Sequence, residues 1–112
     1  MKKAISLPAV LTDEGGKLAL FALLNLGVIE SLASGALGAT EAIRLFYHAD
    51  NCLFVRKHVR DKSADRLMSH GTQLADLFDA LPPEEAHREF QRELEIMRSL
   101  CRHLLEKEPL AA

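Results

Sequence analysis

The chain has 112 residues and a formal net charge of −2, and hydrophobic residues make up 48% of it. This length suits one domain, and this composition argues against a wholly disordered chain. The near-neutral charge and the absence of tryptophan argue against a protein that binds nucleic acid by bulk electrostatics or on an aromatic stacking platform. Two cysteines are too few for a disulfide framework, so we expect reduced thiols.

Residues 1–11 are predicted to form an extended arm, because the residue before Pro8 disfavours helix. The lysines near the start suggest a secretory signal, but Pro8 breaks the apolar stretch that follows and Asp13 ends it. A small-residue cleavage site is also missing there. We therefore expect a cytoplasmic protein that carries no secretory signal.

The first long helix is predicted to begin after Thr12 or Asp13, to run to about Ser34 and to end at Gly35. Apolar residues cover nearly its whole circumference from 18 to 29. That run is a dozen residues long, whereas a membrane span needs about 20. We expect a buried helix and no membrane span.

A second helical segment is predicted to begin with Thr40 as its N-cap, since apolar residues recur from there at spacings of three and four. Asp50 and Asn51 interrupt the pattern. Two alternatives stay open: one continuous helix, or a break at which Asp50 caps a short second helix over 51–59.

A third helix is predicted to start at Ser63 and to continue to Leu81, with its apolar positions inside one arc of about 140°. The fourth follows the break at Pro82 and Pro83 and ends before Pro109. Its apolar seam steps by four and three, through Phe90, Leu94, Met97, Cys101 and Leu104.

Short connections between these helices favour antiparallel neighbours. We therefore predict an all-α fold, a single domain over residues 1–112 built as a compact bundle of four to five helices with antiparallel helical hairpins. The helix over 18–29 is either central or meets a second subunit with one side. In the second case the interface residues would be Leu20, Leu23, Leu24 and Gly27, and a homodimer would cover them. The arm over residues 1–11 is the competing cover.

Two short sequence segments resemble parts of a known protein family. They are Leu26-Gly27-Val28-Ile29-Glu30-Ser31-Leu32, followed by Gly35 and Glu41-Ala42, and His70-Gly71-Thr72-Gln73-Leu74-Ala75-Asp76. Over residues 20–78 the chain resembles a family of small, uncharacterised bacterial helical proteins. The resemblance implies no established activity and no catalytic residues.

The chain lacks a nucleophile elbow, a phosphate-binding glycine loop and paired cysteines with zinc spacing. His48 with Cys52, and Glu84 with His87, offer two ligands each, which is fewer than a zinc site needs. We therefore predict no metal, no cofactor and no catalytic residue.

A small-ligand sensor or enzyme would use His70, Thr72 and Asp76, although Thr72 and Asp76 lie away from His70 on a helical wheel. Gly71 beside them is better explained by close packing of another helix, because glycine costs a helix roughly 1 kcal/mol relative to alanine.

A nucleic-acid-binding regulator would use residues 56–66, where five basic residues gather but Asp61 and Asp65 offset them. We favour a third hypothesis, a non-enzymatic module that binds another protein or a second copy of itself. The observation that supports this hypothesis is the excess of apolar surface on the first helix.

Overall fold

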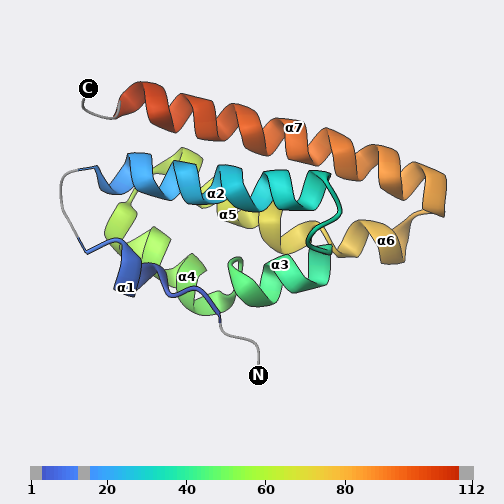
Figure 1. Cartoon of the computed structure of the whole chain (residues 1–112), viewed down its shortest axis with the longest axis horizontal. Helices are drawn as coiled ribbons and strands as arrows, with labels where there is room; N and C mark the ends of the chain where they lie inside the picture. Colours follow the sequence, from blue (N-terminus) through green and yellow to red (C-terminus); the bar gives the residue numbers. More distant parts are fainter. Residues whose placement is uncertain (1–3, 13–15, 109–112) are drawn as a thin grey trace.

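The computed structural model describes residues 4–12 and 16–108, and within them it contains helices and no strand. The predicted all-α fold is confirmed (Figure 1). The helices are α1 (Leu7–Val10), α2 (Lys17–Ala33), α3 (Ala39–Leu45), α4 (Ala49–Phe54), the π-helix η1 (Val55–Val59), α5 (Lys62–Gln73), α6 (Asp76–Ala80) and α7 (Pro83–Lys107).

The two longest helices, α2 and α7, pack against each other in antiparallel directions (Figure 1). The predicted seam of α7, Phe90, Leu94, Met97, Cys101 and Leu104, is buried throughout. Helix α2 contributes Phe21, Ile29 and Leu32 to the same core. In Figure 1, α2 lies between α7 on one side and α1 with α3 on the other, while α5 passes behind it.

The N-terminal segment is not wholly extended, so that prediction was wrong for α1. Pro8 occupies the first turn of α1, where its missing N–H removes no helical hydrogen bond. Leu7 and Leu11 are buried, which gives this short turn a packing reason. Thr12 does not cap α2, whose N-cap is Gly16, and the alternative cap Asp13 lies outside the described residues.

The buried side chain of Asn51 fastens this segment to the core. Its Oδ1 accepts a hydrogen bond from the Leu7 N–H at 2.9 Å, and its Nδ2 donates to the carbonyls of Ile5 and Phe46 at 2.9 and 2.8 Å. His48 Nε2 also lies 2.9 Å from the Ile5 carbonyl. These bonds satisfy main-chain groups that burial would otherwise leave unpaired.

The second helical segment is broken between α3 and α4, which decides between the two alternatives. The cap of α4 is His48, whose Nδ1 accepts from the Asn51 N–H at 3.4 Å, and not Asp50, which is exposed. Thr40 likewise lies inside α3. The N-cap there is Gly38, whose N–H donates to the Glu41 carboxylate at 3.1 Å.

Tyr47 lies at this break and is among the largest fully buried side chains. Its hydroxyl donates to Asn25 Oδ1 on α2 at 3.1 Å, and Asn25 Nδ2 in turn donates to the Phe21 carbonyl at 3.0 Å. Its ring lies against Gly71 of α5 so closely that a Cβ there would overlap the ring carbons. The packing reason predicted for Gly71 is therefore confirmed.

The predicted third helix is two helices, α5 and α6, separated at Leu74 and Ala75. Leu74 stays buried, and both α5 and α6 pack on α7, where the rings of Phe78 and Phe90 lie 5.3 Å apart. The helix begins earlier than predicted, because Asp61 is its cap. Asp61 Oδ1 accepts from the Ser63 and Ala64 N–H groups at 2.8 and 3.0 Å.

Replacing a glycine by alanine normally stabilises a helix, but the contact between Gly71 and Tyr47 predicts that this replacement destabilises α5. Gly71→Ala should lower the free energy of unfolding by about 1–3 kcal/mol, because the added methyl group meets a buried ring that has no space to move. Gly27→Ala is the matched control, since nothing lies within 4 Å of a Cβ there. It should raise stability by up to about 1 kcal/mol. Urea denaturation in dilute solution measures both, and equal effects would contradict the packing account.

The cap at Asp61 predicts a pH-dependent contribution to stability. Burial raises the pKa of this carboxyl, but the hydrogen bond from Lys107 and those from the backbone of Ala64 and Ser63 outweigh it and leave the pKa below its ordinary 3.8. At neutral pH, Asp61→Ala should therefore cost about 1 kcal/mol. A lowered pKa in the folded state means that this contribution is complete above the unfolded pKa and is lost as the pH falls through the folded one.

Denaturation of wild type and Asp61→Ala at neutral and acidic pH checks this, and their difference should shrink in acid. Asp50→Ala is the control, because Asp50 is exposed and caps nothing. It should change stability by no more than about 0.5 kcal/mol. A cost at Asp61 that grows as the pH falls would show that the carboxylate is not the stabilising form.

Candidate functional site

One side of α2 faces outward along the whole helix. At 100° per residue, its members fall within one arc, and each is exposed or half-buried: Lys17, Leu20, Leu23, Leu24, Gly27, Glu30, Ser31 and Ser34. The four residues predicted as an interface, Leu20, Leu23, Leu24 and Gly27, lie together in the first half of this arc. We call these four residues the α2 strip.

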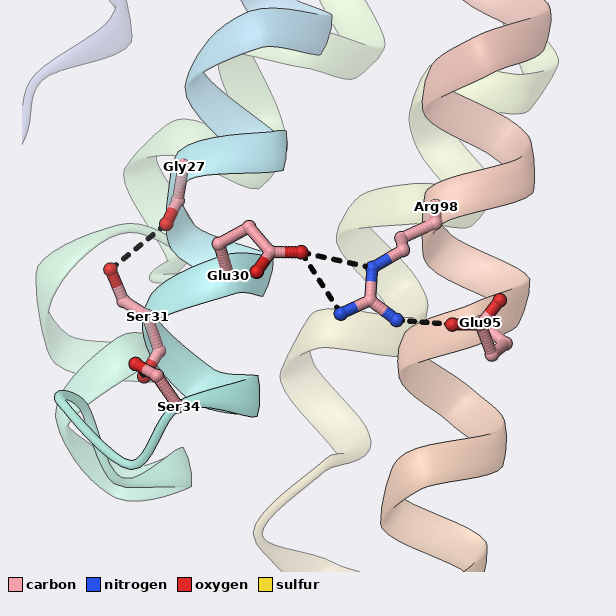
Figure 2. A network of polar contacts seen from close by, with 6 residues as sticks. All are labelled: Gly27, Glu30, Ser31, Ser34, Glu95 and Arg98. Atoms are coloured by element: carbon pink, nitrogen blue, oxygen red, sulfur yellow. Dashed lines mark hydrogen bonds and ion pairs between the residues drawn. The ribbon is translucent and has the colours of Figure 1, made fainter.

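The α2 strip is apolar and uncharged. Leu20 and Leu23 are 38% and 40% exposed, Leu24 is half-buried and Gly27 is exposed. The C-terminal half of the same side is polar. There Ser31 Oγ donates to the Gly27 carbonyl at 2.9 Å, and Ser34 lies on the same side (Figure 2). The change from leucine to serine confines the apolar surface to about two turns of the helix.

Charged groups lie at the C-terminal border of the α2 strip. Figure 2 shows Glu30 reaching from α2 to Arg98 of α7, whose guanidinium lies between Glu30 and Glu95. Arg98 Nη2 and Nε donate to the same oxygen, Glu30 Oε1, at 3.0 and 3.3 Å. The Glu30 side chain is nevertheless 70% exposed, so its carboxylate remains open to further contacts.

Each of the other exposed large apolar side chains lies on a different helix. Val10, Leu53 and Phe78 belong to α1, α4 and α6, respectively. Single exposed apolar residues are normal on a soluble surface, whereas several on adjacent turns of one helix form a patch. Among the described residues, the α2 strip therefore stands out as the surface that favours association.

The three residues that a small-ligand sensor or enzyme would use, His70, Thr72 and Asp76, make separate contacts in the structure, and a ligand contact there stays a prediction. His70 Nδ1 lies 2.6 Å from Glu93 Oε1 of α7, while Thr72 Oγ1 donates to the Ser69 carbonyl of its own helix at 2.7 Å. Asp76 is exposed at the start of α6, beyond the break in the helix. His70 and Thr72 lie on one helix but on different faces, so their side chains point in different directions.

The His70–Glu93 pair is the partly buried ionisable contact that the sequence did not reveal. Both side chains are about a quarter exposed or less, and they lie beside a shallow hollow of about 160 Å³ lined by Arg66, Ser69, His70 and Gln73. A carboxylate can orient an imidazole for proton transfer. Ser69 lines the same hollow, and among the described residues no hydrogen bond joins it to His70.

The basic residues between 56 and 66 are exposed, as a nucleic-acid interface would require, but they do not form a purely positive surface. Arg56 and Arg66 line a hollow of about 390 Å³ together with Asp65 and with Cys52, Met68, Ser69 and Thr72. Asp61 forms an ion pair with Lys107 at 2.8 Å. The acidic residues thus lie among the basic ones in space, as they do in the sequence.

Within residues 4–12 and 16–108, no three metal-binding side chains come together. The two pairs considered from the sequence have other surroundings: His48 contacts the main chain of Ile5, and Glu84 and His87 are exposed at the start of α7. In the same part of the chain, no helix combines the length and apolar character needed to cross a membrane.

Neither a protein-family model, nor a curated protein, nor a solved structure shows significant similarity to the chain. The resemblance of residues 20–78 to a family of small bacterial proteins therefore stays a prediction.

The two cysteines are predicted to differ in reactivity. Burial raises the pKa of the Cys101 thiol to about 12, which Arg102 only partly offsets. Cys52 is half-buried at the edge of the 390 Å³ hollow, and burial raises its pKa too, with Arg56 lowering it. A disulfide reagent should therefore label Cys52 in the native protein and Cys101 only after unfolding.

Counting released thiolate in native and denatured protein checks this expectation. In Cys52→Ser the native reaction should disappear, while the denatured protein still shows one reactive thiol. Rapid labelling of native Cys52→Ser would place Cys101 outside the core.

Proposed function

We propose that this protein is a non-enzymatic interaction module that associates with a second copy of itself through the α2 strip. The observation that carries the proposal is the exposure of Leu20 and Leu23 on adjacent turns of a helix, beside Leu24 and Gly27. Apolar area removed from water contributes about 25 cal/mol per Å². Burial of these leucines is therefore the main favourable contribution to the free energy of association at this surface.

The absence of charge within the strip supports a second copy as its partner. A twofold axis places the same surface of both subunits in contact, so a charged residue near the axis would face its own like charge. From Leu18 to Ile29 the chain has no charged residue, and the polar Asn25 is buried on the inner side of α2. The surface therefore meets its own copy without repulsion.

The polar groups of the described residues support an interaction role more than catalysis. His70 and Glu93 form a pair, but Thr72 and Asp76 point to other surroundings. The hollow of about 390 Å³ is lined by Asp65 as well as by Arg56 and Arg66. A catalytic site needs several groups within reach of one reacting atom, and here the candidate groups diverge.

Sedimentation equilibrium over a range of protein concentrations tests the proposal. The wild-type chain should show a reversible dimer, weak because the strip is smaller than a standard interface. Leu23→Glu should sediment as a monomer and keep its helical circular dichroism, since this side chain already reaches solvent. Leu53→Glu is the matched control, because Leu53 is 48% exposed on another helix, and it should dimerise like wild type.

A wild-type mass that stays monomeric at every concentration would overturn the proposal. An effect of Leu53→Glu as large as that of Leu23→Glu would also overturn it, because the α2 strip would then not be the interface.

A further inference from the structure

The exposed side of α2 is complementary to itself about a point midway between Leu23 and Leu24. We infer that two copies pair through α2 in antiparallel directions, with a twofold axis at this point. The inference rests on the proposed self-association and adds the direction, the register and the residue pairs of the interface.

The register follows from counting outward from that midpoint. In an antiparallel pair, residues equally distant from the axis on the two copies lie opposite each other. Leu23 then meets Leu24 of the second copy, Leu20 meets Gly27, and Lys17 meets Glu30. These six residues all belong to the exposed side of α2. At 1.5 Å per residue, the contact extends about 20 Å along the helix.

Leu20 and Gly27 match in shape. Leu20 projects into solvent, and nothing in its own chain lies within 4 Å of a Cβ built at Gly27. The side chain of one copy therefore fits over the glycine of the other, and the two backbones can approach closely there. Because of the twofold axis, this contact occurs twice, once on each side of the central leucines.

Lys17 and Glu30 match in charge. Along α2 they are the first charged residues on either side of the α2 strip, and they have opposite signs. Arg98 donates to Oε1 of Glu30, and the 70% exposure of this side chain leaves Oε2 for the ammonium group of the opposite Lys17. A parallel pair would instead place lysine beside lysine and glutamate beside glutamate, which disfavours that arrangement.

Cysteine cross-linking reads the direction and register directly. Cys52→Ser removes the reactive native thiol, and buried Cys101 stays. Into this background we would introduce Leu20→Cys or Gly27→Cys, with a purification tag on one variant so that mixed dimers differ in mass. Under mild oxidation, an equal mixture should give the mixed disulfide dimer. Each variant alone should give at least tenfold less, because its two thiols lie about 10 Å apart along the axis, beyond disulfide reach.

Charge exchange provides a second, independent measurement. Lys17→Glu and Glu30→Lys should each weaken the dimer about two- to tenfold, since each removes the two exposed ion pairs between the subunits. Glu30→Lys also removes the Glu30–Arg98 ion pair, but that pair lies within one chain and is lost from monomer and dimer alike. The double variant, with both changes in one chain, should return to within about twofold of wild type. Lys57→Glu is the control for net charge, because Lys57 is exposed on η1, and it should leave the dimer unchanged.

The outcomes separate the two proposals. A wild-type monomer overturns the proposed function and this inference together. If Leu23→Glu dissociates the dimer, but each cysteine variant forms a disulfide with a second copy of itself, the proposed function stands and the two helices pair in parallel. If the same dimer forms no disulfide in any mixture, the antiparallel register alone is overturned. The register is also overturned if the double charge variant dimerises more weakly than both single variants.

Discussion

The arrangement of the helices depends on the position of one side chain, Tyr47. It lies where the chain breaks between α3 and α4, its ring covers Gly71 of α5, and its hydroxyl reaches Asn25 of α2. Burial raises the pKa of this hydroxyl, with Cys101 raising it further, so it stays a neutral donor. One residue thus fixes the spacing of α5 and the rotation of α2, because a close ring contact and a buried hydrogen bond both require definite geometry.

The rotation of α2 decides which of its apolar residues reach solvent. The helix is apolar on nearly every side, so hydrophobicity alone would allow several rotations. Asn25 removes this freedom, since any rotation that moved it away from Tyr47 would leave a buried amide without its partner. The exposure of Leu20 and Leu23 is therefore a consequence of the polar contact on the opposite side of the same helix.

Sequence patterns predicted the features that depend on local chemistry. The seam of α7 follows from its spacing, the end of α2 from Gly35, whose φ is +83°, and the packing over Gly71 from the cost of glycine in a helix. The α1 turn and the break after α5 were not predictable in this way. They depend on contacts distant in sequence, such as Asn51 with Leu7 and α6 with α7. The pairing of His70 with Glu93 gave no local signal either, whereas the opposite charges of Lys17 and Glu30 are visible in the sequence once the outward side of α2 is known.

The packing of α2 against α7 also has a consequence for folding during synthesis on the ribosome. Helix α2, the most apolar of the three longest helices, is synthesised before α7, which begins fifty residues after α2 ends, as counted from Ala33 to Pro83. At translation rates of roughly 5–20 residues per second, several seconds pass between the synthesis of α2 and that of α7. During that interval the side of α2 that α7 later covers, and not only the strip that stays open in the folded molecule, is available to chaperones and to neighbouring nascent chains.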